Sequence, residues 1–197
     1  MHRRTFLGAA SVSSVGALAG CGGLGGPTPL TDVEVVTEDD GMDHHLTFYQ
    51  DNTEQATLTV SQGNAPEAYT DRFSLRLHLW HRPGLRTEHM AFEVRGPPGG
   101  AGVPAETYLK VPDGGPWPEF RIEKDDDLST IIAVDDLGEL GEGSLGFELI
   151  VDPTTTPVDA ISVHADVTFD RTETFSGTYR AETTNIFDIV RDTDQRP

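Results

Sequence analysis

The sequence contains almost no cysteine and almost no lysine. Cys21 is the only cysteine, so the chain can form no internal disulfide. Lys110 and Lys124 are the only lysines among 14 basic residues, against 33 acidic ones, and the net charge is −19. Because the chain also lacks a basic patch with interleaved aromatic residues, the sequence argues against a nucleic-acid-binding protein.

The N-terminal apolar run, residues 8–20, is too short to cross a bilayer, which takes about 20 apolar residues. It is preceded by a basic pair and two apolar residues: Arg3, Arg4, Phe6 and Leu7. It ends in small or apolar residues just before the cysteine: Leu18, Ala19 and Gly20. A basic start, an apolar middle and a small-residue end are the parts of a signal peptide. Residues 1–20 are therefore predicted to be removed from the mature protein.

These motifs resemble known export and anchoring signals. Arg3-Arg4 followed by Phe6-Leu7 resembles the twin-arginine motif, and residues 18–21 resemble the lipobox of prokaryotic lipoproteins. The resemblance implies that Cys21 becomes the first residue and carries a covalent lipid at the outer face of the membrane. Together with few lysines and many acids, it is similar to surface lipoproteins of extremely halophilic archaea. Beyond residue 21 this similarity is one of composition only, and it implies no activity.

The acidic residues suit a solvated surface. Removing residues 1–20 takes away two arginines and no acid, so the mature charge is −19 − 2 = −21. The acids are dispersed among regularly alternating apolar residues, which argues against a disordered acidic tail. At 1 M salt, charges are screened over roughly 3 Å, so a large net charge is tolerated there. A docking surface for a basic partner is the alternative interpretation.

The mature chain is expected to form one domain. Residues 21–43 are predicted to be a lipid-anchor cysteine followed by a Gly/Pro-rich and acidic tether, although residues 33–36 could form a first edge strand. Residues 44–190 have the length of a single domain. Residues 191–197 are expected to be a disordered tail.

Apolar residues alternate with polar ones along most of the domain, which is typical of half-buried strands. The clearest examples are residues 73–79, 90–94, 145–151 and 161–169. Turn residues separate these runs, and no long amphipathic helix is indicated, although a short helix or irregular segment could occupy 185–190. We therefore expect an all-β fold, an antiparallel β-sandwich that is immunoglobulin-like or jelly-roll-like, with a closed barrel as the alternative.

The alternation also limits how strands pair. Odd residues face inward in 73–81 and even residues in 88–95, so a hairpin between them needs paired residue numbers with an odd sum. A sum of 169 places Trp80 opposite His89 on the outer face. In the last hairpin, between residues 161–169 and 175–179, both strands are expected to bury odd residues, so paired residue numbers have an even sum. Sums of 342 or 344 give loops of three or five residues.

Metal ligands are weakly indicated. His78 and His81 should point to opposite faces of one strand, which argues against a zinc site shared with His89. The run Asp125, Asp126 and Asp127 could coordinate calcium if other loops come close, although no EF-hand loop is present. No other cofactor is predicted.

No catalytic motif stands out. The chain lacks a G-x-S-x-G nucleophile elbow and a phosphate-binding loop, and its one cysteine is the predicted anchor. Trp80, expected on an outer face beside His89, could contact an unknown surface protein or ligand. The sequence thus favours a non-catalytic binding or scaffolding domain at the cell surface. The alternatives are a solute- or metal-binding accessory lipoprotein of a transporter and an extracytoplasmic hydrolase.

Overall fold

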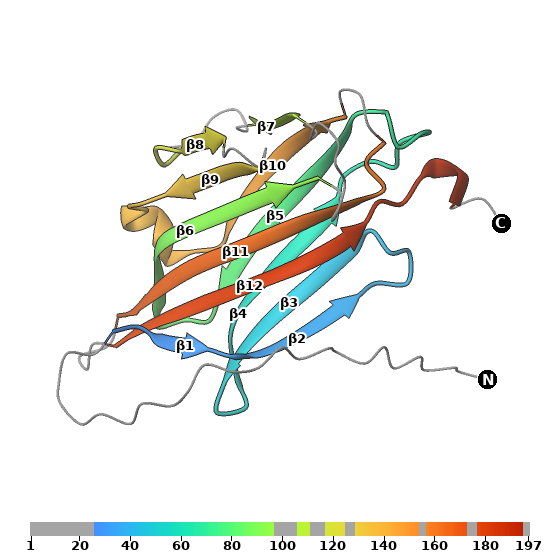
Figure 1. The fold of residues 1–197 in the computed structure, drawn as a ribbon. Helices are drawn as coiled ribbons and strands as arrows, with labels where there is room; N and C mark the ends of the chain where they lie inside the picture. Colours follow the sequence, from blue (N-terminus) through green and yellow to red (C-terminus); the bar gives the residue numbers. More distant parts are fainter. Residues whose placement is uncertain are drawn as a thin grey trace, which may run out of the picture.

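Two six-stranded sheets pack face to face (Figure 1). The computed structural model describes residues 26–96, 106–110, 117–124, 129–153, 157–172 and 177–194. The first sheet has the order β1 (Thr28–Leu30), β12 (Thr178–Asp188), β11 (Ala160–Arg171), β6 (Leu85–Arg95), β9 (Thr130–Val134) and β8 (Arg121–Lys124). The second has the order β2 (Asp32–Thr37), β3 (Asp43–Gln50), β4 (Thr53–Gln62), β5 (Phe73–His81), β10 (Leu145–Asp152) and β7 (Glu106–Lys110). The predicted all-β sandwich is confirmed.

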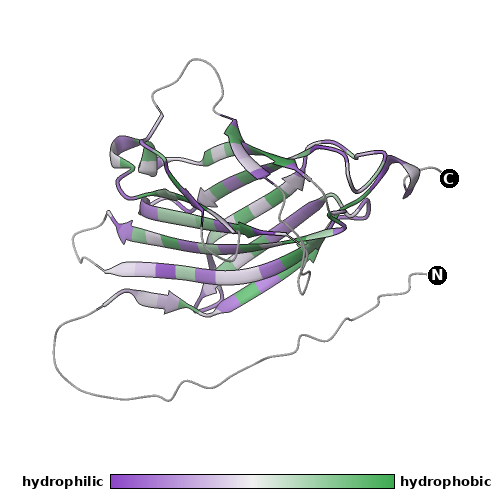
Figure 2. Cartoon of the chain, turned by 45° about the horizontal axis from the view of Figure 1, so that its top comes forward, coloured by the Kyte–Doolittle hydropathy of each residue, from purple (hydrophilic) through white to green (hydrophobic). Residues whose placement is uncertain are grey.

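The core lies between the two sheets and is built by the period-two alternation. Figure 2 shows hydrophobic and hydrophilic residues alternating along the strands. The inward side chains include four phenylalanines that are at most 2% exposed: Phe48, Phe73, Phe92 and Phe169. Burying one such side chain contributes about 1.5–3 kcal/mol, so the inner faces dominate the stability of the fold.

The predicted hairpin between residues 73–81 and 88–95 is wrong. β5 pairs with β4 and β10 in the second sheet, whereas β6 pairs with β11 and β9 in the first. The turn between them contains Gly84 at φ 91°, and the Arg82 N–H donates to the Gln55 carbonyl. The chain therefore crosses the end of the sandwich. The alternation of apolar residues indicates which face of a strand is buried, but not which strand lies beside it. It therefore could not distinguish a hairpin within one sheet from a crossing between the two sheets.

The last hairpin has the predicted parity but a different register. Val163 lies opposite Asn185 and Phe169 opposite Tyr179, so paired numbers sum to 348 rather than 342 or 344. β12 runs to Asp188, through the segment for which a helix or irregular structure was considered. The reason is burial: Phe187 lies opposite Ile161, and both are at most 3% exposed.

Both predicted ends of the domain also need correction. β1 and β2 lie inside the predicted tether of residues 21–43, and Leu30 is 2% exposed in the core. The edge strand considered at 33–36 is confirmed as part of β2. At the other end, the predicted tail begins with a short 3-10 turn, η2 (Asp192–Asp194), whose Asp192 N–H donates to the Pro66 carbonyl. Residues 21–25 and 195–197 lie outside the described residues.

A second 3-10 turn, η1 (Gly138–Glu142), packs against β6 and provides a test of this packing. A Cβ added to Gly141 would lie 2.1 Å from the Thr87 carbonyl oxygen, which is backbone and cannot move aside cheaply. We expect Gly141→Ala to lower the free energy of unfolding by about 1–3 kcal/mol. Gly143→Ala is the matched control, because its Cβ would meet nothing within 4 Å. Equal denaturant midpoints for the two variants would contradict this packing.

Candidate binding groove

The first sheet has an incompletely paired edge. β1 runs parallel to β12 but covers only Tyr179–Ala181, after which the chain crosses at Thr31 into β2 of the other sheet. β12 continues for seven more residues, 182–188, with β11 on one side and no other strand of the described chain on the other. We call residues 182–188 the open edge.

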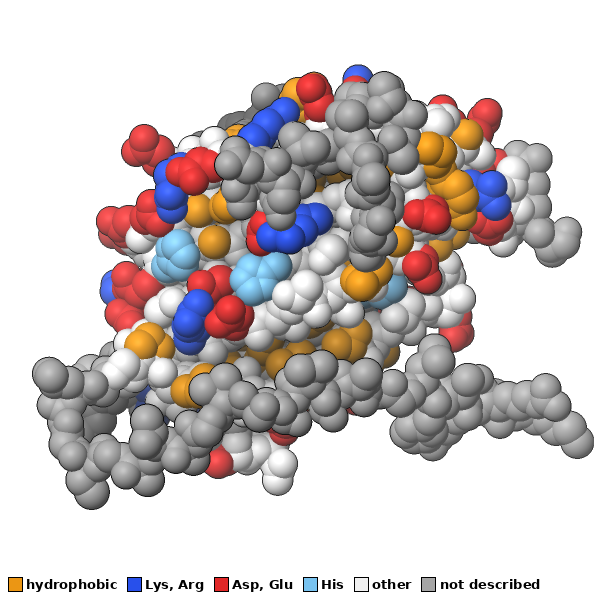
Figure 3. Space-filling model, in the orientation of Figure 1, with side chains coloured by type: hydrophobic (Ala, Val, Ile, Leu, Met, Phe, Trp, Pro, Cys, Tyr) orange, Lys and Arg blue, Asp and Glu red, His pale blue; other side chains and the backbone are white. Residues whose placement is uncertain are grey.

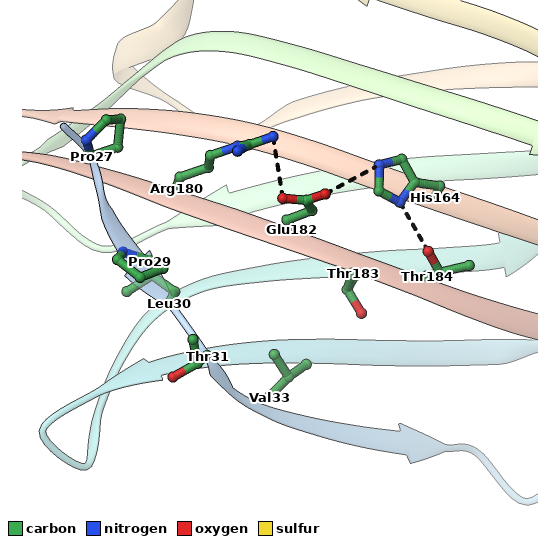
Figure 4. Close-up of a pocket in the computed structure, with 10 residues that line it drawn as sticks. All are labelled: Pro27, Pro29, Leu30, Thr31, Val33, His164, Arg180, Glu182, Thr183 and Thr184. Atoms are coloured by element: carbon green, nitrogen blue, oxygen red, sulfur yellow. Dashed lines mark hydrogen bonds and ion pairs between the residues drawn. The ribbon is translucent and has the colours of Figure 1, made fainter. Parts of the chain in front are cut away.

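A groove of about 620 Å³ lies where the open edge begins (Figure 4). This volume falls within the roughly 300–1,000 Å³ of ligand pockets. Its lining comes from both ends of the domain: Pro27, Pro29, Leu30, Thr31, Val33, His164, Arg180, Glu182, Thr183 and Thr184. The β1–β2 crossover forms a mainly apolar wall, and β11 and β12 form a polar wall.

The polar wall is an ordered network of side chains. The Arg180 guanidinium donates from Nε and Nη2 to the two Asp166 carboxylate oxygens, both at 2.8 Å, and lies 3.2 Å from Glu182. His164 Nδ1 lies 2.9 Å from Thr184 Oγ1, and its Nε2 lies 3.9 Å from Glu182 Oε1. Figure 3 shows acidic side chains and histidines side by side on this outer face. Two carboxylates against one guanidinium leave the wall acidic.

The Asp166–Arg180 pair gives stability that depends on pH. The hydrogen bonds between Arg180 and Asp166 hold the pKa of the Asp166 carboxyl below its usual value. The same bonds raise the pKa of the Arg180 guanidinium. Because the folded state lowers the carboxyl pKa, the contribution is present above the unfolded value of about 3.9 and is lost as the pH falls through the lower folded value.

Asp166→Asn is expected to lower the free energy of unfolding by about 1 kcal/mol at neutral pH, and by much less near pH 2. Denaturant titrations at both pH values, in constant salt, measure this. Glu67→Gln is the control, because Glu67 is exposed. If Asp166→Asn lowered the free energy of unfolding by the same amount at both pH values, the charge-pair explanation would be contradicted.

Trp80 and His89 are not brought together as predicted. Trp80 lies on the outer face of the second sheet opposite Thr57, and it is 37% exposed. His89 lies in the first sheet opposite Thr168, with Nδ1 3.4 Å from Asp135. The shared contact is wrong because β5 and β6 belong to different sheets. Neither residue lines the groove.

The other histidines diverge as expected. His78 is exposed on β5, whereas His81 is buried, with Nε2 2.9 Å from the Gly141 carbonyl oxygen. His44 packs edge-on against Phe187, and burial lowers its pKa, while His45 faces Thr59. Across the described ranges, no three or more His, Cys, Asp or Glu residues are grouped to hold a metal.

Several predicted site residues lie outside the described residues. They are the export residues Arg3, Arg4, Phe6 and Leu7, the cleavage residues Leu18, Ala19 and Gly20, the anchor Cys21, and the acidic run Asp125, Asp126 and Asp127. The lipid anchor and the calcium site therefore stay predictions. No helix in the described part of the chain is long and apolar enough to cross a membrane.

The groove was missed from the sequence because its walls are far apart in the chain. One signal did point to it. On β12 the inward positions are Tyr179, Ala181, Thr183, Asn185 and Phe187, so two polar residues interrupt the alternation of the last strand. Polar residues at inward positions indicate a stretch that the opposite sheet does not fully cover.

Comparison with known proteins gives a family but no activity. Residues 28–191, from the first residue of β1 to just beyond β12, match the model described as Domain of unknown function (DUF8121). The chain belongs to this family. The matched range includes every residue that lines the groove except Pro27. No curated protein matches the chain.

Solved structures similar to this DUF8121 chain include three β-rich domains. The seventh ScaB type I cohesin from Pseudobacteroides cellulosolvens has 13% identity and a TM-score of 0.39, over 70% of this chain and 95% of the cohesin. The human F-spondin reeler domain has 11% identity and a TM-score of 0.37, over 66% and 89%. The collagen-binding domain of a Staphylococcus aureus adhesin has 7% identity and a TM-score of 0.35, over 63% and 95%.

Proposed function

We propose that this DUF8121 protein is a non-catalytic binding domain, exported to the outer face of the cell membrane and held there by a lipid on Cys21. The groove is its binding surface. The observation that carries the proposal is the open groove at the point where the chain enters the domain, lined by the first two strands and by β11 and β12. The twin-arginine and lipobox resemblances supply the location.

The position of the anchor favours a partner at the membrane. Pro27, which lines the groove, is six residues after Cys21. Fully extended chain spans at most about 3.3–3.6 Å per residue, so this connection reaches roughly 20 Å. A lipid on Cys21 would keep the groove within that distance of the bilayer surface. The partner is then a membrane protein or a ligand presented at the membrane.

A second candidate is a solute-binding accessory subunit of a transporter. The hydroxyl-bearing residues Thr31, Thr183 and Thr184 favour it, because they line the groove beside Arg180 and could bind a polar solute.

Photo-crosslinking in intact cells tests the proposal. A photoreactive residue at Thr183, in the groove, is compared with one at Arg76, which is exposed on the outer face of the second sheet. We expect one reproducible protein adduct from position 183 and none from position 76. In a Cys21→Ser background the adduct should disappear, because the domain leaves the membrane.

Other outcomes would decide against parts of the proposal. Equal labelling from both positions, or no adduct from either, would contradict protein binding in the groove. An adduct that persists undiminished in Cys21→Ser would contradict the anchor. Failure to crosslink together with saturable binding of a small solute would favour the accessory-subunit candidate.

A further inference from the structure

We infer that the open edge of β12 accepts an extended segment of a partner protein as an added strand, with cationic side chains alternating with small apolar ones. This inference rests on the proposed binding role of the groove. It specifies the mode of binding and the chemistry of the partner.

Along the open edge, backbone amides of β12 point away from β11, and no strand of the described chain pairs with them. The Ile186 N–H is bonded to the Asn185 side chain, N to Oδ1 at 3.1 Å, so it takes no part in the ladder with β11. Backbone amides alternate in direction along a strand, so the Thr184 N–H faces the same side. Pairing through such amides is the basis of recognition by strand addition.

The residues of the open edge do not protect it. Natural edge strands are commonly blunted by proline, lysine or clustered charge. β1 contains Pro29 and is preceded by Pro27, both without a backbone N–H, and β8 has Arg121 and Lys124. The open edge reads Glu-Thr-Thr-Asn-Ile-Phe-Asp, without proline or lysine, and Ile186 is 53% exposed. β12 thus presents an edge that can be extended.

The inner side of the edge favours small apolar side chains. Val33 and Val35 lie opposite Phe48 and Leu46, so they face the interior of the sandwich. Val35 is nevertheless 48% exposed, and the first sheet ends on this side with β1 and β12. Figure 3 shows hydrophobic atoms at the surface below β12. Inward side chains of an added strand would cover this apolar surface.

The outer side favours cations. The outward residues along the open edge include two acids, Glu182 and Asp188, and Asp166 lies opposite Glu182 on β11. Among the described residues that line the groove, Arg180 is the one arginine or lysine, and it is already engaged by Asp166 and Glu182. Outward side chains of an added strand would therefore meet Asp188 and also Glu182, which shares one guanidinium with Asp166, and this excess of carboxylates selects for arginine or lysine.

Amide hydrogen exchange measured by NMR on the mature protein tests the inference. The probe is a seven-residue peptide of alternating arginine and valine, and the control has the same composition with all arginines before all valines. The alternating peptide should slow exchange at Thr184 and Ile186 by about tenfold or more at saturation. Exchange at Val163 and Ala165, inside the β11 ladder, should not change. No slowing at Thr184 and Ile186, or equal slowing by both peptides, would overturn strand addition.

Two variants sharpen the test. Ile186→Pro removes the N–H on the open side and should abolish the protection at Thr184. Val35→Arg leaves the backbone intact and places a cation on the apolar side, so it should weaken peptide binding even if Ile186→Pro fails to fold. Unchanged binding to Val35→Arg would count against the inference. Crosslinking from position 183 without slowed exchange would overturn strand addition but leave the proposed function standing.

Discussion

Diluting the salt from about 3 M to about 0.1 M is expected to unfold the domain. The screening length grows from under about 3 Å to about 10 Å over this range, so the acidic side chains begin to repel one another across the surface. The chain carries 33 acids against 14 bases. The fluorescence of Trp80 and Trp117, each 37% exposed, and circular dichroism report the transition.

Charge-reversal variants separate this explanation from a specific ion requirement. Asp32 and Asp39 are both exposed. Replacing both with lysine should allow the domain to fold at a lower salt concentration, because the net charge becomes less negative by four. An unfolding temperature that is the same in 0.1 M and 3 M salt would contradict the acidic-coat interpretation.

Phe92→Ala should lower the free energy of unfolding by about 3–5 kcal/mol. Phe92 is fully buried on β6, which pairs with β11 and β9, and its ring lies 5.4 Å from that of Phe147 on β10 of the other sheet. Truncation leaves a cavity between the sheets and removes this aromatic contact. Since domains are typically stable by about 5–15 kcal/mol, the loss is a large share of the total.

Denaturant titration in constant high salt measures the effect. Ile122→Ala on β8 is the control, because Ile122 is 50% exposed, and its cost should be about 0.5 kcal/mol or less. If Phe92→Ala cost no more than Ile122→Ala, the two sheets would not pack as described.

The fold class could be predicted because a strand carries its burial pattern locally. In β5, every second residue from Phe73 to Leu79 is apolar, and the structure buries all four of these side chains. The neighbours of β5 could not be predicted, because parity is satisfied equally by a hairpin to β6 and by a crossing into the other sheet. The predicted register of the last hairpin was wrong for the same reason, because alternation fits the observed pairing of Val163 with Asn185 as well as it fits the predicted sums.

The groove could not be predicted from local sequence, because its walls come from opposite ends of the chain. Pro29 and Thr31 meet Arg180 and Thr183 only because β1 pairs with the last strand. The local sequence of residues 22–30 suggested a tether, since glycine and proline are common there. The polar residues Thr183 and Asn185 were the available hint, and they are informative only once the inward face of β12 is known.

The most direct test of the central claim, a binding domain anchored at the membrane, is the mass of the N-terminal peptide of the protein purified from membranes. We expect a chain that begins at Cys21 and carries the added mass of a lipid. An N-terminus at Met1, or an unmodified Cys21, would contradict the anchor and remove the reason for placing the groove at the membrane surface.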